Sequence, residues 1–70
     1  MIDILHSEEY RTASDTATIK VQRYIDSGFG AWVIWRITIR RDRDELGRIL
    51  EQRLLRRPSD SKIKRIIARY

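Results

Sequence analysis

Apolar and polar side chains alternate in two segments of this 70-residue chain, residues 16–26 and 35–40. In the second segment Trp35, Ile37 and Ile39 take every other position. Successive side chains of a strand point to opposite faces, so a period of two predicts a strand in each segment. One face of each strand would be buried, and we expect Trp35 in the core.

The segment between the two strands, residues 26–30 (DSGFG), is typical of a hairpin turn because its glycines tolerate positive φ. A turn centred on Gly28 gives a register that assembles one continuous apolar face. The expected pairs are Val21–Trp35, Ile19–Ile37 and Ala17–Ile39 on that face, and Tyr24–Trp32, Thr18–Thr38 and Lys20–Arg36 on the other. The last pair opposes like charges, which is unfavourable unless an anion or a nearby acid compensates.

Residues 1–15 have no sustained pattern. The apolar run IDIL is followed by SEEYRTASD, which does not continue it. A short strand, a loose arm and a single helical turn remain alternatives for this segment.

After residue 41 the spacing becomes helical. Asp42 can cap a first helix, with Glu45 three residues later to close a capping box, and Pro58 would end it. The apolar stripe of this helix would be Leu46, Ile49, Leu50 and Leu54.

A second helix is expected after the cap candidates in residues 59–61 (SDS), because apolar residues again recur at helical spacing. Its apolar stripe would be Ile63, Ile66, Ile67 and Tyr70. The elements together predict one small α+β domain over residues 1–70: an arm or short strand (1–15), a β-hairpin (16–41) and a helix–turn–helix pair (42–70). A chain this short buries little surface, so we expect a dimer.

The net charge of +5 is unevenly distributed. Residues 1–35 hold three basic and five acidic side chains, a net charge of −2, whereas residues 36–70 hold twelve basic and five acidic ones, a net charge of +7. Ten of those twelve are arginines, which favour forked contacts to phosphates and base edges. The alternative is a merely solvated basic surface.

The C-terminal half, with RITIR at 36–40, DEL at 44–46 and SDSKIKRIIARY at 59–70, resembles ribbon-helix-helix DNA-binding proteins of the Arc, MetJ and CopG kind. The resemblance implies that two subunits pair their strands into a ribbon that enters the major groove, while the start of the second helix meets a phosphate. It leaves open whether strand 36–40 pairs within its chain, with another subunit, or with both. It assigns base contacts to Arg36, Thr38 and Arg40, core positions to Ile37 and Ile39, and the phosphate-facing helix start to Ser61 and Lys62.

We therefore expect a homodimeric, sequence-specific regulator that binds double-stranded DNA. A two-stranded ribbon fits the major groove, and arginine can fork onto guanine. The N–H groups at a helix start suit phosphate. The expected phosphate contacts are Ser61, Lys62, Arg65 and Lys20.

An alternative function uses the other polar-face residues. Tyr24, Trp32 and Ile34 would form a partner or dimer face, which fits a small protein-interaction or inhibitor module of phage or plasmid type. A third possibility is stacking of single-stranded RNA on Tyr24 and Trp32.

Catalysis, cofactors and metals are not expected. The chain has no cysteine and one histidine, His6, which lies beside Glu8 and Glu9 without a nucleophile to serve. Asp42, Asp44 and Glu45 are explained by capping rather than by metal binding. No apolar run is long enough to span a membrane, and the N-terminus is acidic where a signal peptide is basic. We expect a cytoplasmic, intracellular protein, associated with the nucleoid if it binds DNA.

Overall fold

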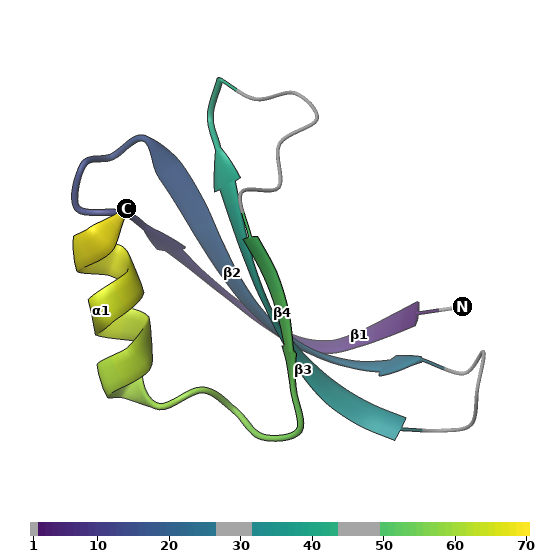
Figure 1. Cartoon of the computed structure of the whole chain (residues 1–70). Coiled ribbons are helices and arrows are strands. Elements are labelled where there is room, and N and C mark those ends of the chain that lie inside the picture. The colour runs from purple at the N-terminus through teal and green to yellow at the C-terminus, as the bar shows by residue number, and fades with distance from the viewer. Residues whose placement is uncertain (1, 27–31, 44–49) are drawn as a thin grey trace.

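The computed structural model of this protein describes residues 2–26, 32–43 and 50–70, and shows an antiparallel sheet with one helix (Figure 1). The strands lie in the sheet in the same order as in the chain, and each strand pairs antiparallel with the next. Its elements are β1 (Ile2–Arg11), β2 (Ala17–Asp26), β3 (Trp32–Arg41), β4 (Leu50–Leu54) and α1 (Asp60–Arg69).

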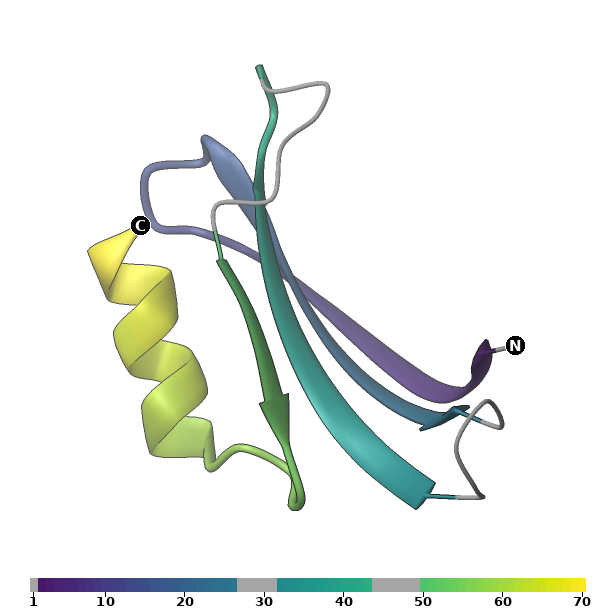
Figure 2. The same ribbon diagram turned by 45° about the vertical axis from the view of Figure 1, so that its right-hand side comes forward.

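The core lies between α1 and one face of the sheet, which we call the covered face. Ile19, Val21, Ile37 and Ile39 project from β2 and β3 and are fully buried, and Ile63 of α1 packs against them. The helix covers only the end of the sheet near the turn between β1 and β2, the near end (Figure 2). The far end, with the N-terminus and the start of β3, extends away from α1.

The predicted antiparallel pairing of the two central strands is confirmed, but its register differs by two residues. Ile19 lies opposite Ile39, and Val21 lies opposite Ile37. A shift of two keeps every side chain on its face, so the apolar face survives. The expected opposition of two like charges is absent, because Lys20 faces Thr38.

The predicted fold of a hairpin followed by two helices is wrong. Residues 50–54 form β4 rather than the end of a first helix, and β4 pairs with β3. Five residues beginning and ending in leucine fit a period of two as well as a helical stripe. Pairing also gives hydrogen-bond partners to backbone groups of β3 that an edge strand leaves unpaired. Leu46 and Ile49 of the expected stripe lie outside the described residues.

The resemblance to ribbon-helix-helix proteins is wrong for the same reason. β3 pairs along one edge with β2 and along the other with β4, both in its own chain. A second subunit therefore finds no free edge over residues 35–39 of β3 with which to build a ribbon, and the described residues form one helix where the family has two.

The segments before and after the central strands also took definite structures. In the N-terminal segment the strand alternative is the one adopted, as β1, with a bulge between Ile4 and His6. The second predicted helix is confirmed as α1. Ser59 caps it, because the Ser59 Oγ accepts a hydrogen bond from the Lys62 backbone N–H at 3.2 Å.

Candidate functional site

The face of the sheet opposite α1, the open face, gathers most of the polar side chains of the strands. Directly opposed residues share a face, so the register fixes which side chains are neighbours. Five basic and three acidic side chains lie on this face among the residues that the structure describes, and one of the acids, Asp26, lies in the far-end row Ile2–Asp26–Trp32. The cross-strand rows are Arg11–Thr18–Arg40, Glu9–Lys20–Thr38–Glu51 and Ser7–Gln22–Arg36–Arg53.

Arg36 lies on the open face as predicted, but it is engaged within the protein. Its Nη2 donates to Gln22 Oε1 at 2.8 Å, and its Nη1 lies 3.6 Å from Glu51 Oε1. The guanidinium also stacks 4.9 Å from the centre of the Tyr24 ring. The Arg36 side chain is only 16% exposed, so it is poorly placed to contact a base.

The other open-face residues differ in how well they reach solvent. Thr38 is half-buried between Lys20 and Glu51, and Arg40 is exposed. Lys20 and Arg53 are exposed, and neither side chain has a hydrogen bond or ion pair with any residue in the described ranges. These two cations are available to an outside ligand.

The expected phosphate contacts do not come together. Lys20 lies on the open face, whereas Ser61, Lys62 and Arg65 belong to α1, which packs on the covered face. The sheet separates the two groups, so a single flat ligand cannot touch both.

The three residues of the expected partner face differ in how exposed their side chains are. Tyr24 is 1% exposed beneath Arg36, Ile34 is half-buried, and Trp32 is 67% exposed. Only Trp32 offers a large surface. Other exposed apolar side chains lie at the same end of the sheet, with Ile2 and Ile4 on the face of Trp32 and Val33 on the opposite face. We call this group the far-end cluster: Ile2, Ile4, Leu5, Trp32 and Val33.

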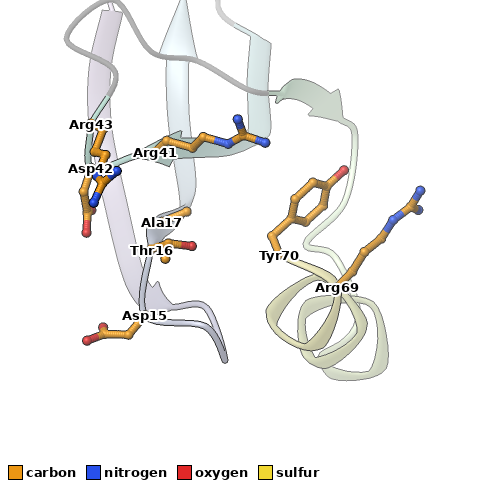
Figure 3. Close-up of a pocket in the computed structure, with 8 residues that line it drawn as sticks. All are labelled: Asp15, Thr16, Ala17, Arg41, Asp42, Arg43, Arg69 and Tyr70. Carbon is orange, nitrogen blue, oxygen red and sulfur yellow. The ribbon is translucent and has the colours of Figure 1, made fainter.

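A pocket of about 660 Å³ opens at the near end, between the sheet and the end of α1 (Figure 3). Three segments distant in the sequence meet there. In Figure 3 the Arg41 side chain extends from the end of β3 toward Tyr70. The lining residues are Asp15, Thr16, Ala17, Arg41, Asp42, Arg43, Arg69 and Tyr70.

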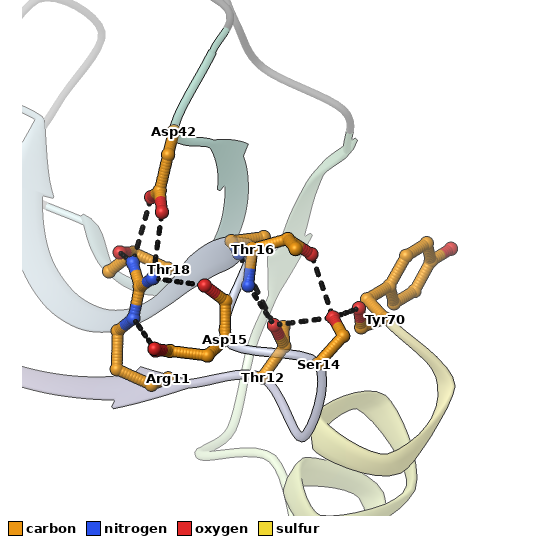
Figure 4. Close-up of polar contacts among 9 residues, drawn as sticks. Arg11, Thr12, Ser14, Asp15, Thr16, Thr18, Asp42 and Tyr70 are labelled. Carbon is orange, nitrogen blue, oxygen red and sulfur yellow. Dashed lines mark hydrogen bonds and ion pairs between the residues drawn. The ribbon is translucent and has the colours of Figure 1, made fainter.

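Arg11 binds the two acidic residues that line this pocket (Figure 4). Its Nη1 and Nη2 donate to the two carboxylate oxygens of Asp42 at 2.8 and 2.7 Å, and its Nε donates to Asp15 Oδ1 at 2.9 Å. The fork-on-fork contact to Asp42 raises the pKa of Arg11 and lowers the pKa of Asp42. Both acids of the pocket are thus paired with one arginine.

A second polar cluster lies on the covered face and centres on Glu8, which is next to His6 in space. Glu8 accepts hydrogen bonds from Arg57 Nη2 and from the Tyr10 hydroxyl, each at 2.8 Å. The contact to Arg57, followed by that to Tyr10, lowers the pKa of Glu8 to about 2. His6 Nε2 lies 3.3 Å from Glu8 Oε2. These contacts join β1 to the segment before α1. Their role is therefore structural.

The described parts of the chain contain no group of three His, Cys, Asp or Glu residues arranged to hold a metal ion. They also contain no helix long and apolar enough to cross a membrane. No protein-family model, curated protein or solved structure matches this chain.

Sequence reasoning missed three contributors to the polar surface. Arg53 was placed in a helix, and only the pairing of β4 with β3 brings it to the open face. Arg11 lay in the segment without a clear pattern. Arg69 joins Arg41 in the pocket through the packing of α1, which no local pattern of the sequence reveals.

Proposed function

We propose that this protein binds DNA through phosphate contacts made by the open face of its sheet. One observation supports the proposal: five basic and three acidic side chains lie on a face that α1 leaves uncovered. Double-helical DNA carries one negative charge per roughly 1.7 Å of its axis, so a surface of this kind attracts it strongly at low salt.

The proposed contacts are with the backbone of the duplex rather than with bases in the groove. A four-stranded sheet is about 14 Å across before side chains are counted, which exceeds the roughly 12 Å width of the major groove. Lys20 and Arg53 reach outward, whereas Arg36 is occupied by Gln22 and Glu51. We therefore propose affinity for phosphates with little sequence preference in place of base reading by the strand.

The test compares two double variants of equal charge. Lys20→Gln/Arg53→Gln removes two open-face cations, and Lys64→Gln/Arg65→Gln removes one lysine and one arginine elsewhere. Lys64 and Arg65 are exposed on α1, which packs on the covered face. Binding of a labelled 20-base-pair duplex is measured by anisotropy over a range of salt concentrations.

We expect the open-face variant to bind at least tenfold more weakly than wild type, with a salt slope smaller by about two, because two phosphate contacts are lost. The control variant should change much less. Equal losses in both variants would mean that the open face is not the site. No binding of wild type at low salt would refute DNA binding itself.

We further propose that the protein acts as a homodimer joined through the far-end cluster. An uncovered tryptophan offers on the order of 150 Å² of apolar surface. The other four members of the cluster are each 39–49% exposed and add apolar surface on both faces of this end, so an interface that buries all five wraps around the end of the sheet. The described charged neighbours, Asp3, Arg23 and Asp26, have a net charge of only −1. Two copies of a basic protein can therefore meet here with little repulsion.

The far-end cluster also favours a second candidate function, the protein-interaction module. In that case a different protein would occupy the cluster, and the charge of the open face would meet an acidic surface. The salt titration separates the two functions, because a module of this kind need not retain a duplex at low salt.

A further inference from the structure

The near-end pocket combines paired acids with unpaired arginines. Arg11 engages both Asp15 and Asp42. Arg41, Arg43 and Arg69 also line the pocket, and none of the three has an ion pair with a residue that the structure describes. The two acids are thus neutralised by an arginine outside the lining, and the pocket keeps an excess of positive charge.

We propose that this pocket binds a phosphate group carried on a small organic molecule or on the end of a DNA strand. Arginine presents a planar fork of N–H donors that matches phosphate oxygens, and the three arginines supply several such donors around one opening. The Thr16 hydroxyl on the same lining lies 2.7 Å from Ser14 Oγ and donates to it, because the Ser14 proton is given to the Tyr70 carbonyl oxygen, so the arginines are the donors left for a ligand. This inference goes beyond the proposed DNA binding by the open face, and it does not depend on it.

The size of the pocket points to a phosphate with a group attached. A volume of about 660 Å³ lies within the range of small-molecule sites, roughly 300–1,000 Å³, and exceeds what a bare phosphate fills. The ring of Tyr70 forms part of the lining and gives the attached group an apolar contact.

Hydrogen bonds join the backbone segments that form the walls of the pocket. The turn between β1 and β2 is joined to α1 by a hydrogen bond from the Ala13 N–H to the Ile67 carbonyl oxygen at 2.9 Å. Ser14 Oγ donates to the Tyr70 carbonyl oxygen (Figure 4). The Asp42 N–H donates to the Thr16 carbonyl oxygen at 3.0 Å and links β3 to the same turn.

One contribution opposes an anion here, because the C-terminal end of a helix carries about half a negative charge. Arg69 lies in that last turn and offsets it. Arg41 and Arg43 then add two positive charges. The balance favours phosphate.

The experiment titrates the full chain with inorganic phosphate and with adenosine monophosphate, with adenosine as the uncharged comparison, at constant ionic strength. Binding is followed by calorimetry and by NMR shifts of the Thr16 and Arg41 amides. The pocket variant is Arg41→Gln/Arg69→Gln, and the control Arg23→Gln/Arg56→Gln removes two exposed arginines outside the pocket. Thermal unfolding verifies that both variants are folded.

We expect saturable binding of adenosine monophosphate that is at least tenfold tighter than that of adenosine, at least tenfold weaker in the pocket variant, and nearly unchanged in the control. A second arm compares one oligonucleotide with and without a 5′-phosphate. A preference for the 5′-phosphate that the pocket variant loses identifies a DNA end as the source, and its absence beside nucleotide binding identifies a free phosphate compound.

Absence of saturable binding, or equal weakening in pocket and control variants, would overturn the proposal. Failure here is distinct from failure of DNA binding by the open face. That function is tested by Lys20 and Arg53, which do not line the pocket.

Discussion

Arg36 and Arg53 lie opposite each other on neighbouring strands of the open face, yet they have different roles. Arg36 is bound to Gln22, paired with Glu51 and stacked on a buried tyrosine, and its Nε is buried without a partner among the described residues. Arg53 is exposed and has no described partner. Alternation predicted the face of Arg36, but it predicted neither the face of Arg53 nor the local environment of either guanidinium.

We predict that Arg36→Met lowers the free energy of unfolding by about 1–2 kcal/mol, because Gln22 and Glu51 lose a charged partner and Tyr24 loses its stacked cation. Arg53→Met, the matched control, should change it by no more than about 0.5 kcal/mol. Urea denaturation measures both. Similar losses in the two variants would show that Arg36 does not hold the strands as described.

At the scale of elements, the Glu8–Arg57 contact joins strand β1 to the segment that leads into α1. Arg57 donates two hydrogen bonds to the Glu8 carboxylate, at 2.8 and 3.1 Å, and a third to Asp60 Oδ1 at 3.0 Å. The Glu8 side chain is 21% exposed, so solvent screens this pair only in part. The contact fixes where α1 begins relative to the sheet.

We predict that Glu8→Gln destabilises the fold by about 1 kcal/mol at neutral pH, through loss of these charged hydrogen bonds. The pKa of Glu8 falls from its usual 4.5 to about 2 in the folded protein. The stabilisation is therefore complete above pH 4.5 and is lost as the pH falls toward 2.

Urea denaturation at pH 7 and at pH 2.5 tests this. The difference between wild type and Glu8→Gln should shrink at the lower pH. Glu9→Gln is the control, because Glu9 is exposed on the open face and has no described contact to Arg57. A difference that is constant with pH would contradict the assigned pair.

The whole molecule is thin, with principal extents of 38 × 28 × 15 Å. At the near end two layers enclose a core, but at the far end the sheet stands as a single layer away from α1 (Figure 2). A single layer cannot bury its apolar side chains alone. The far-end cluster is the direct consequence.

We predict that the protein sediments as a dimer of twice its 8.4 kDa mass. Ile2→Thr/Trp32→Thr should weaken the dimer at least tenfold, because it removes apolar area from the proposed interface. Leu55→Thr is the control, because Leu55 is 84% exposed but lies outside the far-end cluster. A monomeric wild type at high concentration would refute the homodimer and favour a different protein as the occupant.

The local sequence pattern predicted the two central strands and the C-terminal helix. Alternation identified the two central strands and the face that holds Ile37 and Ile39, since strand periodicity depends only on the chain itself. The Ser59 cap and the spacing after it identified α1. For the candidate site, the sequence correctly placed Arg36, Thr38 and Arg40 together on the polar face, with Lys20 beside them.

Tertiary structure decided the rest, because it depends on partners distant in sequence. Residues 50–54 fit both the helical and the strand period locally. They form a strand because they pair with the edge of β3 that β2 leaves open. That pairing brought Arg53 to the open face, paired Glu51 with Arg36 and left no edge for a ribbon. The sequence by itself thus determined which side chains of β2 and β3 share a face, because strand periodicity is local. Long-range packing added the side chains of β4 to that face and determined which cations remain available to a ligand.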